Sequence, residues 1–343
     1  MNKTVSIAKG VGILLMVIGH SGCPSNMRSF IYVFHMPLFF FLSGYCFKEK
    51  YLLEPGRFIL RKIKTIYWPF VKYALLFLFL HNIFFYLEIY NGTYGYNGNT
   101  SVMYSPKDVV VRAFNIITRM IDNEQLLGGF WFLKQLLLAS VIGFFFIKLF
   151  RNSKWKVFFL VIVTFLIKWM GVSIPFWHIG WLTFLSATFF VAGYDFSKTE
   201  EKNSYSSIIM SCLVVLACSL YYDAEMSHYT LSSMLPCIFS AVFGCIGVFY
   251  FSKILSSMEN VLTKFLTFIG NHTMPILIWH FLCFKLVSLV IILVYSLPVE
   301  QLAEFPVIET HATRYWWLAY VFIGSTLPLL LDSIKEKFVR VLS

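Results

Sequence analysis

Long apolar runs alternate with short polar segments along the whole chain. A helix needs roughly 20 mostly apolar residues to cross a bilayer. Ten runs come close to this length: 7–23, 30–47, 67–90, 130–150, 156–171, 177–194, 205–222, 231–252, 272–295 and 315–333. They are too continuous for the strands of a membrane barrel, in which apolar and polar residues alternate. The pattern therefore predicts an all-α, polytopic membrane protein with about ten transmembrane helices.

Composition supports this interpretation. Hydrophobic residues make up 58% of the 343 residues and charged residues only 13%, against roughly a quarter in soluble domains. These values exclude a disordered chain, a disulfide-rich secreted module and a soluble nucleic-acid binder. Membrane lipids are therefore expected partners and nucleic acid is not. We interpret residues 1–343 as a single integral-membrane domain.

Basic residues predict the orientation. With the N-terminus inside, eighteen of the 28 Lys and Arg residues fall in cytoplasmic segments, five in external segments and five within the runs. Loops rich in Lys and Arg stay in the cytoplasm, so both chain ends are predicted to be cytoplasmic. A lipoprotein signal ending at Cys23 is the alternative for the first run. His20 stands where such a signal has a small or medium apolar residue, which favours a membrane helix.

Acidic residues and histidines are distributed differently. All 17 Asp and Glu residues lie in loops or near the ends of runs, whereas ion-coupled transporters usually carry a carboxylate within a span. His20, His35, His81 and His280 lie inside runs or near their ends. Neutral histidine titrates near neutrality and suits a general base; the alternative is a hydrogen-bonded side chain inside the bundle. The seven cysteines show neither disulfide nor metal-site spacing, so no metal is expected.

Lys9 and His20 lie eleven residues apart in the first run. At about 100° and 1.5 Å per residue, they face one side of a helix to within about 20° and are roughly 16 Å apart. Gly10 and Gly12 keep the stretch between them slim. This geometry suits a long ligand with an anionic head at the cytoplasmic edge and a reactive tip deep in the membrane.

Two further segments carry candidate chemistry. Arg61, Lys62 and Lys64 precede the third run and could hold phosphates, or serve only as a topological anchor. In the external segment 91–129, Ser105-Pro106 predicts a helix start. The apolar residues of that helix are Val110, Phe114, Ile117 and Ile121. The segment either faces a sugar or is an ordinary loop between spans.

Several of these stretches resemble the membrane acyltransferase 3 family. Lys9–His20 is similar to its first helix, in which a basic residue, ten further residues and His recur. Phe34–Tyr45 is close to its second-helix signature, and Arg61 with Lys64 matches its Arg-x-x-Arg pair, with Lys in the second place. Trp131–Leu133 and Gly270–His280 resemble later, looser blocks. The chain most resembles the stand-alone O-acetyltransferases, including fucose 4-O-acetylase-like proteins.

The resemblance implies an enzyme that moves an acyl group, usually acetyl from cytoplasmic acetyl-CoA, to a hydroxyl of a cell-surface glycan or its lipid-linked precursor. It implies a multi-pass protein of the bacterial cytoplasmic (inner) membrane that needs no metal. His20 and His35 become the catalytic candidates, with His20 as general base or transient acyl carrier. Lys9, Arg61, Lys62 and Lys64 are expected to bind the CoA moiety. Ser43, Trp131 and His280 are expected to support the substrate or the oxyanion.

Two other functions remain compatible with the residues alone. A transporter or flippase for a glycan or small solute would need a polar path through several spans and no CoA. A sensory or scaffold protein would be expected to carry an attached soluble signalling domain. Turnover of acetyl-CoA separates the enzyme from both.

Overall fold

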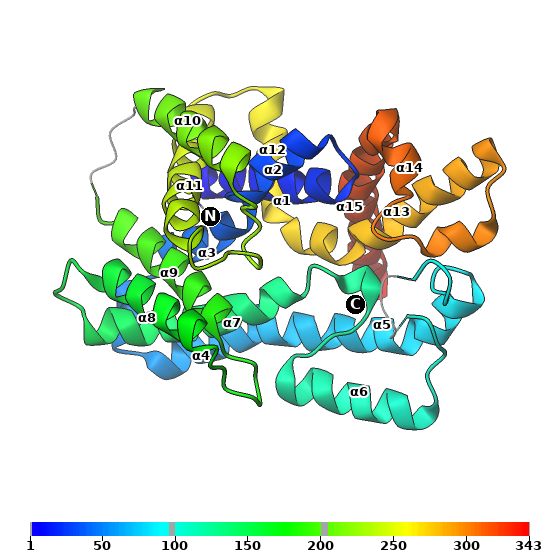
Figure 1. Ribbon diagram of the computed structural model, residues 1–343, viewed down its shortest axis with the longest axis horizontal. Coiled ribbons are helices and arrows are strands. Elements are labelled where there is room, and N and C mark those ends of the chain that lie inside the picture. Colours follow the sequence, from blue (N-terminus) through cyan, green and yellow to red (C-terminus); the bar gives the residue numbers. More distant parts are fainter. Residues whose placement is uncertain (1, 96–99, 200–204, 343) are drawn as a thin grey trace. The chain divides into compact units, whose positions relative to one another are not determined.

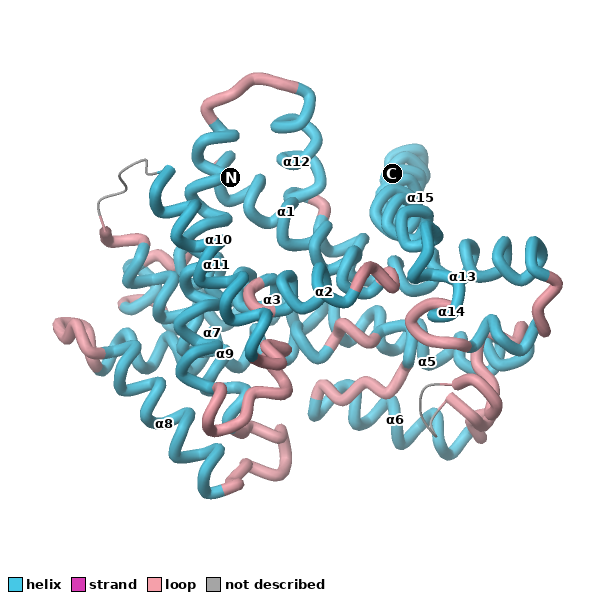
Figure 2. Tube along the Cα trace, turned by 45° about the horizontal axis from the view of Figure 1, so that its top comes forward, coloured by secondary structure: helices cyan, strands magenta, loops and turns pink. Residues whose placement is uncertain are grey.

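The computed structural model describes residues 2–95, 100–199 and 205–342, with side chains described up to residue 333. Residues 96–99 of the predicted external segment lie outside the described residues. Within the described ranges the secondary structure is helical, and the one extended pairing is a bridge between Ile174 and Ile179 (Figure 2). The all-α prediction is therefore confirmed.

The chain forms two compact units, each built from three separate stretches. Unit 1 comprises residues 1–12, 25–68 and 132–271, and unit 2 comprises residues 13–24, 69–131 and 272–343. Helix α1 (Lys3–His20) gives its first part to unit 1 and its last part to unit 2. Lys9 therefore belongs to unit 1 and His20 to unit 2.

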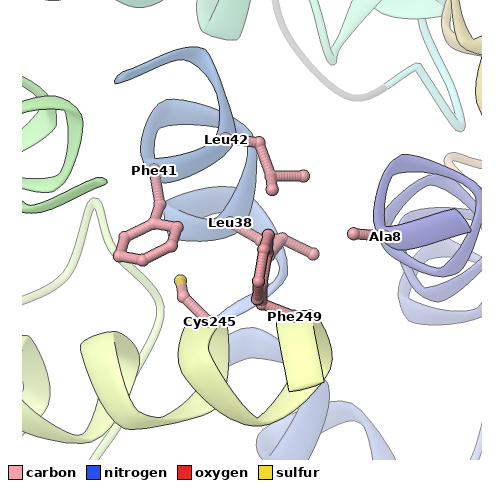
Figure 3. Close-up of a cluster of buried hydrophobic side chains, with 6 residues drawn as sticks. All are labelled: Ala8, Leu38, Phe41, Leu42, Cys245 and Phe249. Carbon is pink, nitrogen blue, oxygen red and sulfur yellow. The ribbon is translucent and has the colours of Figure 1, made fainter. Parts of the chain in front are cut away.

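Unit 1 packs short and long helices together. Beside α1 it contains α2 (Ser25–Tyr32), α3 (His35–Tyr45), η1 (Glu49–Leu52), α4 (Pro55–Lys62), η2 (Ile63–Tyr67), most of α7 (Trp131–Leu149), α8 (Lys156–Met170), α9 (Trp181–Phe196), α10 (Tyr205–Tyr221), α11 (Met234–Ser256) and α12 (Val261–Asn271). Helix α3 packs on α9, and α10 packs along α11 (Figure 1). Part of the core lies where α1, α3 and α11 meet, with Leu38, Phe41 and Phe249 at most 1% exposed (Figure 3).

Helices α3 and α9 touch backbone to backbone. A Cβ atom at Gly44 would collide with the carbonyl group of Phe190, and one at Gly193 would collide with that of Phe41. Small residues at such positions let membrane helices approach closely, which gains dispersion energy that side chains would prevent. The contact fixes α3, which carries Ser43, in unit 1.

We expect Gly44→Ala to destabilise the protein by about 1–3 kcal/mol, the usual cost of overpacking a tight contact. The measurement is the thermal unfolding midpoint in detergent. Gly56→Ala, in α4, is the matched control, because nothing lies within 4 Å of the added methyl group. Equal midpoints for the two variants would contradict the backbone contact.

Unit 2 contains the rest of α1, most of α5 (Trp68–Tyr86), α6 (Pro106–Arg119), η3 (Gln125–Leu127), α13 (Thr273–Tyr295), η4 (Val299–Ala303), α14 (Glu309–His311), η5 (Ala312–Trp316) and α15 (Trp317–Leu342). Helix α13 packs against α15. The Nζ atom of Lys285 in α13 donates to the carbonyl oxygens of Leu302 and Glu304, both at 2.8 Å. These bonds tie the segment after α13 back onto that helix.

Helix α6 begins where the sequence predicted. Ser105 caps it, and Asp108 completes a capping box that leaves Pro106 at the first turn. Hydrogen bonds from the Ser105 hydroxyl and backbone N–H hold the pKa of the Asp108 carboxyl below its usual value. Val110 and Phe114 are 69% and 60% exposed. The apolar face of α6 is therefore open to the surroundings, as expected for a helix lying at a membrane interface.

Each of the ten predicted runs coincides with a helix or a pair of helices. Five helical segments among the described residues are long and apolar enough to cross a membrane: Lys3–His20, Pro55–Tyr86, Trp131–Leu149, Met234–Ser256 and Thr273–Tyr295. The count of ten spans and the cytoplasmic position of both ends stay predictions.

Two boundaries differ from the sequence prediction. The run 30–47 is split, because α2 ends at Tyr32 and α3 begins at His35. The run 67–90 begins earlier, because α4, η2 and α5 form one helical segment from Pro55. Arg61 and Lys62 therefore lie on a helix and not in the predicted loop. The apolar pattern missed this part because the mean hydropathy of α4 is low, with Arg57, Arg61 and Lys62 inside it.

Candidate active site

A group of cations gathers in unit 1. Arg61 and Lys62 lie in the last turn of α4, and Lys64 follows in the wide π-helical turn η2. The positive charges of Arg61 and of Lys9 on α1 both act on Lys62. All three charges also act on the thiol of Cys46, so one neighbourhood contains Lys9, Arg61 and Lys62.

Neutral groups hold these cations in place. The Nη1 atom of Arg61 donates to the hydroxyl of Tyr51 at 2.5 Å, and the Nζ atom of Lys62 donates to the Ser43 hydroxyl at 3.1 Å. Lys62 also lies over the rings of Phe58 and Phe190, at 5.5 and 5.7 Å. These partners orient the side chains without cancelling their charge.

Such a cluster suits an anionic ligand. Positive charges held close together repel one another, and an anion bound among them relieves that repulsion. Arg61 is exposed and Lys9 and Lys62 are partly exposed, so a ligand can reach them. Lys64 is exposed as well. The structure therefore brings together Lys9, Arg61 and Lys62, three of the residues predicted to bind the CoA moiety, with Ser43 beside Lys62.

The predicted reactive histidine lies in unit 2. His20 is the last residue of α1 and is partly exposed. Its ring lies 5.9 Å from that of His280 on α13, with 28° between the ring planes. Phe281 contacts both imidazoles, at 5.0 and 3.9 Å between ring centroids. The structure thus places an accessible imidazole against a second, buried one.

Backbone carbonyl groups hold His280 in one orientation. Its Nδ1 atom lies 2.9 Å from the carbonyl oxygen of Ile276 and 3.2 Å from that of Leu277. The side chain is completely buried, and its Nε2 atom has no hydrogen-bond partner among the described residues. Because a carbonyl oxygen can only accept, Nδ1 carries the proton of the neutral ring and Nε2 carries the lone pair.

The family model of the acyltransferase domain, type 3, matches residues 2–332. The chain belongs to the acyltransferase 3 family. No curated protein and no solved structure matches it. The protein is therefore an acyltransferase with a multi-pass membrane architecture.

Two sequence-predicted residues of this acyltransferase lie apart from the contacts above. His35 is buried in unit 1, where its Nδ1 donates to the carbonyl oxygen of Ile31 at 3.0 Å and its ring lies 5.0 Å from that of Tyr32. In a continuous helix the backbone N–H of residue 35 would be the partner of that carbonyl. His35 thus supports the break between α2 and α3, and its catalytic role stays a prediction.

Trp131 begins α7, belongs to unit 2 and is 38% exposed. Its role in the support of a substrate stays a prediction. Among the described residues, no group of three or more His, Cys, Asp or Glu side chains could hold a metal ion.

Sequence reasoning missed three of the partners. Tyr51 binds Arg61 from ten residues away, Cys46 lies among the cations, and Phe281 contacts both imidazoles. Of these three residues, only Phe281 could have been suggested by its position in the sequence, because it directly follows His280. Tyr51 belongs to a short polar segment that folds into the 3-10 helix η1. The apolar pattern does not predict this helix.

A further pair in unit 2 was also missed. His81 on α5 is fully buried, and its Nδ1 lies 3.1 Å from the Oε2 atom of Glu124, which is 4% exposed. The Nε2 atom of His81 lies 3.0 Å from the carbonyl oxygen of Val102, and Tyr104 stacks on the ring at 3.4 Å. Both ring nitrogens thus bind the segment 91–129, which indicates an anchoring role.

Proposed function

We propose that this acyltransferase moves an acetyl group from cytoplasmic acetyl-CoA to a hydroxyl of a cell-surface glycan or its lipid-linked precursor in the bacterial cytoplasmic membrane. The observation that carries the proposal is the cluster of Lys9, Arg61 and Lys62 in a protein whose family transfers acyl groups. CoA carries several phosphates, which are the ligands that such cations bind best.

The donor site is the cation cluster of unit 1. Arg61, held by Tyr51, and Lys62, held by Ser43, bind phosphate oxygens of CoA, and Lys9 adds a third charge. Lys64 is exposed one turn further along the helix and contributes charge to the approach. Ser43 serves here as a positioning residue for Lys62.

The chemical step takes place at His20. In direct transfer, His20 removes the proton of the acceptor hydroxyl, the hydroxyl oxygen attacks the thioester carbon, and the C–S bond breaks. His20 then returns the proton to the leaving thiolate, so the products are the acetyl ester and CoA. In the alternative route, a ring nitrogen of His20 attacks the thioester carbon, the C–S bond breaks, and CoA leaves as the thiol with the proton of the other ring nitrogen. The acceptor hydroxyl then attacks the acetyl group, the C–N bond breaks, and the hydroxyl proton returns to the ring.

We expect Arg61→Ala to raise the KM for acetyl-CoA by about 10- to 100-fold, because a hydrogen bond between charged groups contributes about 1.5–3 kcal/mol. The assay follows release of CoA and transfer of labelled acetyl by the purified protein in lipid discs, with mixed glycans as acceptors. Arg57→Ala is the matched control, since Arg57 lies on the same helix, is exposed and pairs with Glu54. Its KM should equal that of wild type.

Two results would count against the proposal. If Arg61→Ala and Arg57→Ala changed KM equally, the cluster would not be the CoA site. If the wild type neither bound nor turned over acetyl-CoA or other acyl-CoAs with any acceptor, acyl transfer from CoA would be excluded.

A further inference from the structure

We propose that His280 is the positioning partner of His20, and that its Nε2 lone pair accepts a hydrogen bond from the ring of His20 during acyl transfer. This deepens the proposed function and rests on it. The role differs from support of an oxyanion, which requires a donor. The neutral His280 ring offers an acceptor at Nε2.

The backbone of α13 fixes the tautomer of His280. Ile276 and Leu277 lie one turn before His280, and their carbonyl oxygens accept from Nδ1. Rotating the ring to present Nδ1 elsewhere would lose both contacts in a fully buried position. The helix backbone of α13 therefore keeps the lone pair on Nε2, whatever happens at the substrate.

The Nε2 atom of His280 lacks a hydrogen-bond partner among the described residues. A buried polar atom without a partner costs about 1–3 kcal/mol, and Nε2 of His280 is such an atom. The His280 ring lies beside the rings of Phe281 and Phe284, which cannot donate a conventional hydrogen bond, at 3.9 and 5.7 Å between ring centroids. The imidazole of His20, at 5.9 Å, is the neighbouring ring that can carry an N–H group.

A hydrogen bond to Nε2 of His280 orients the ring of His20. The ring planes of His20 and His280 make an angle of 28° here, and in the proposed arrangement the His20 ring turns so that one of its N–H groups points at the lone pair on Nε2 of His280. One nitrogen of His20 then faces His280 as a donor, so the other keeps its lone pair for the acceptor hydroxyl. When His20 takes the hydroxyl proton and becomes imidazolium, the hydrogen bond to His280 strengthens because its donor is now charged. His280 stays neutral throughout, and the proton returns from His20 to the CoA thiolate.

The test compares two substitutions at one position. Glutamine places a carbonyl oxygen near the position of Nε2 and keeps an acceptor, whereas leucine keeps the volume and removes it. We expect His280→Leu to lower kcat by about 10- to 100-fold, the contribution of a hydrogen bond to a charged donor, with an unchanged KM for acetyl-CoA. His280→Gln should keep most of the wild-type kcat.

A control separates positioning from folding. Ser288 lies on the same helix, and its hydroxyl is hydrogen-bonded to the Tyr320 hydroxyl at 2.8 Å inside the protein. Ser288→Ala should lower the thermal unfolding midpoint and leave kcat unchanged. A merely structural role of His280 would instead lower the apparent kcat of both His280 variants in proportion to their loss of folded protein.

The inference is overturned if His280→Leu has wild-type kcat, or if His280→Gln is as inactive as His280→Leu although both are folded. These results are distinct from failure of the proposed function. In that case the wild-type protein itself would release no CoA from acetyl-CoA, before any variant is considered.

Discussion

His20→Ala should transfer acetyl about 10²- to 10⁴-fold more slowly than wild type, the usual contribution of a positioned general base. His20 is a partly exposed imidazole of unit 2, and its ring lies against those of the buried His280 and of Phe281. The KM for acetyl-CoA should stay near the wild-type value, because Lys9, Arg61 and Lys62 are untouched.

The measurement is kcat for acetyl transfer in lipid discs, with binding of acetyl-CoA followed by calorimetry. His228→Ala is the matched control, because His228 is exposed and pairs with Asp223 in a loop of unit 1. Its kcat should be that of wild type. A wild-type kcat for His20→Ala would remove His20 from the mechanism. Recovery of labelled acetyl on His20 after a brief reaction without acceptor would support the acyl-carrier route over direct transfer.

The second large effect is on stability. The carbonyl oxygen of Val102 can only accept, so Nε2 of His81 carries a proton, and Nδ1 shares a further proton with Glu124. Removing one partner leaves the other buried without its partner, which typically costs about 3–5 kcal/mol. We therefore expect His81→Leu and Glu124→Leu each to lower the thermal unfolding midpoint strongly and to speed proteolysis between residues 100 and 127.

The double variant tests whether His81 and Glu124 are energetically coupled. With both side chains replaced by leucine, neither polar group of the pair is left buried without the other, and such replacements are often neutral or stabilising. His81→Leu/Glu124→Leu should thus be more stable than either single variant. If the double variant lost the sum of the two single effects, the pair would not be coupled. If the single variants unfolded like wild type, the network would not anchor the segment.

Local signals in the sequence were sufficient for part of this structure. The start of α6 was predictable because Ser105, Pro106 and Asp108 act on the turn that they belong to. The positions of the apolar helices followed from run length, since the bilayer sets that length. The spacing between Lys9 and His20 was predictable because both residues lie on the single helix α1.

Other features depend on residues that are far apart in the chain. Glu124 meets His81 across 43 positions, and it lies in a segment that looks like a loop. A search for carboxylates inside apolar runs passes over it, although it is buried beside one. The split between α2 and α3 was missed because Val33 and Phe34 continue the apolar pattern, and hydropathy does not record the hydrogen bond from the His35 side chain to Ile31.

The interleaving of the two units limits how this enzyme can be taken apart or recombined. The chain passes from one unit to the other after residues 12, 24, 68, 131 and 271. No single cut separates the units, so neither unit can be obtained whole as one continuous fragment. Exchange of a donor-binding unit between relatives by one gene-fusion event would leave each product incomplete. New specificities in this architecture are therefore expected to arise by point substitution and loop change within a full-length chain, and not by shuffling of intact domains.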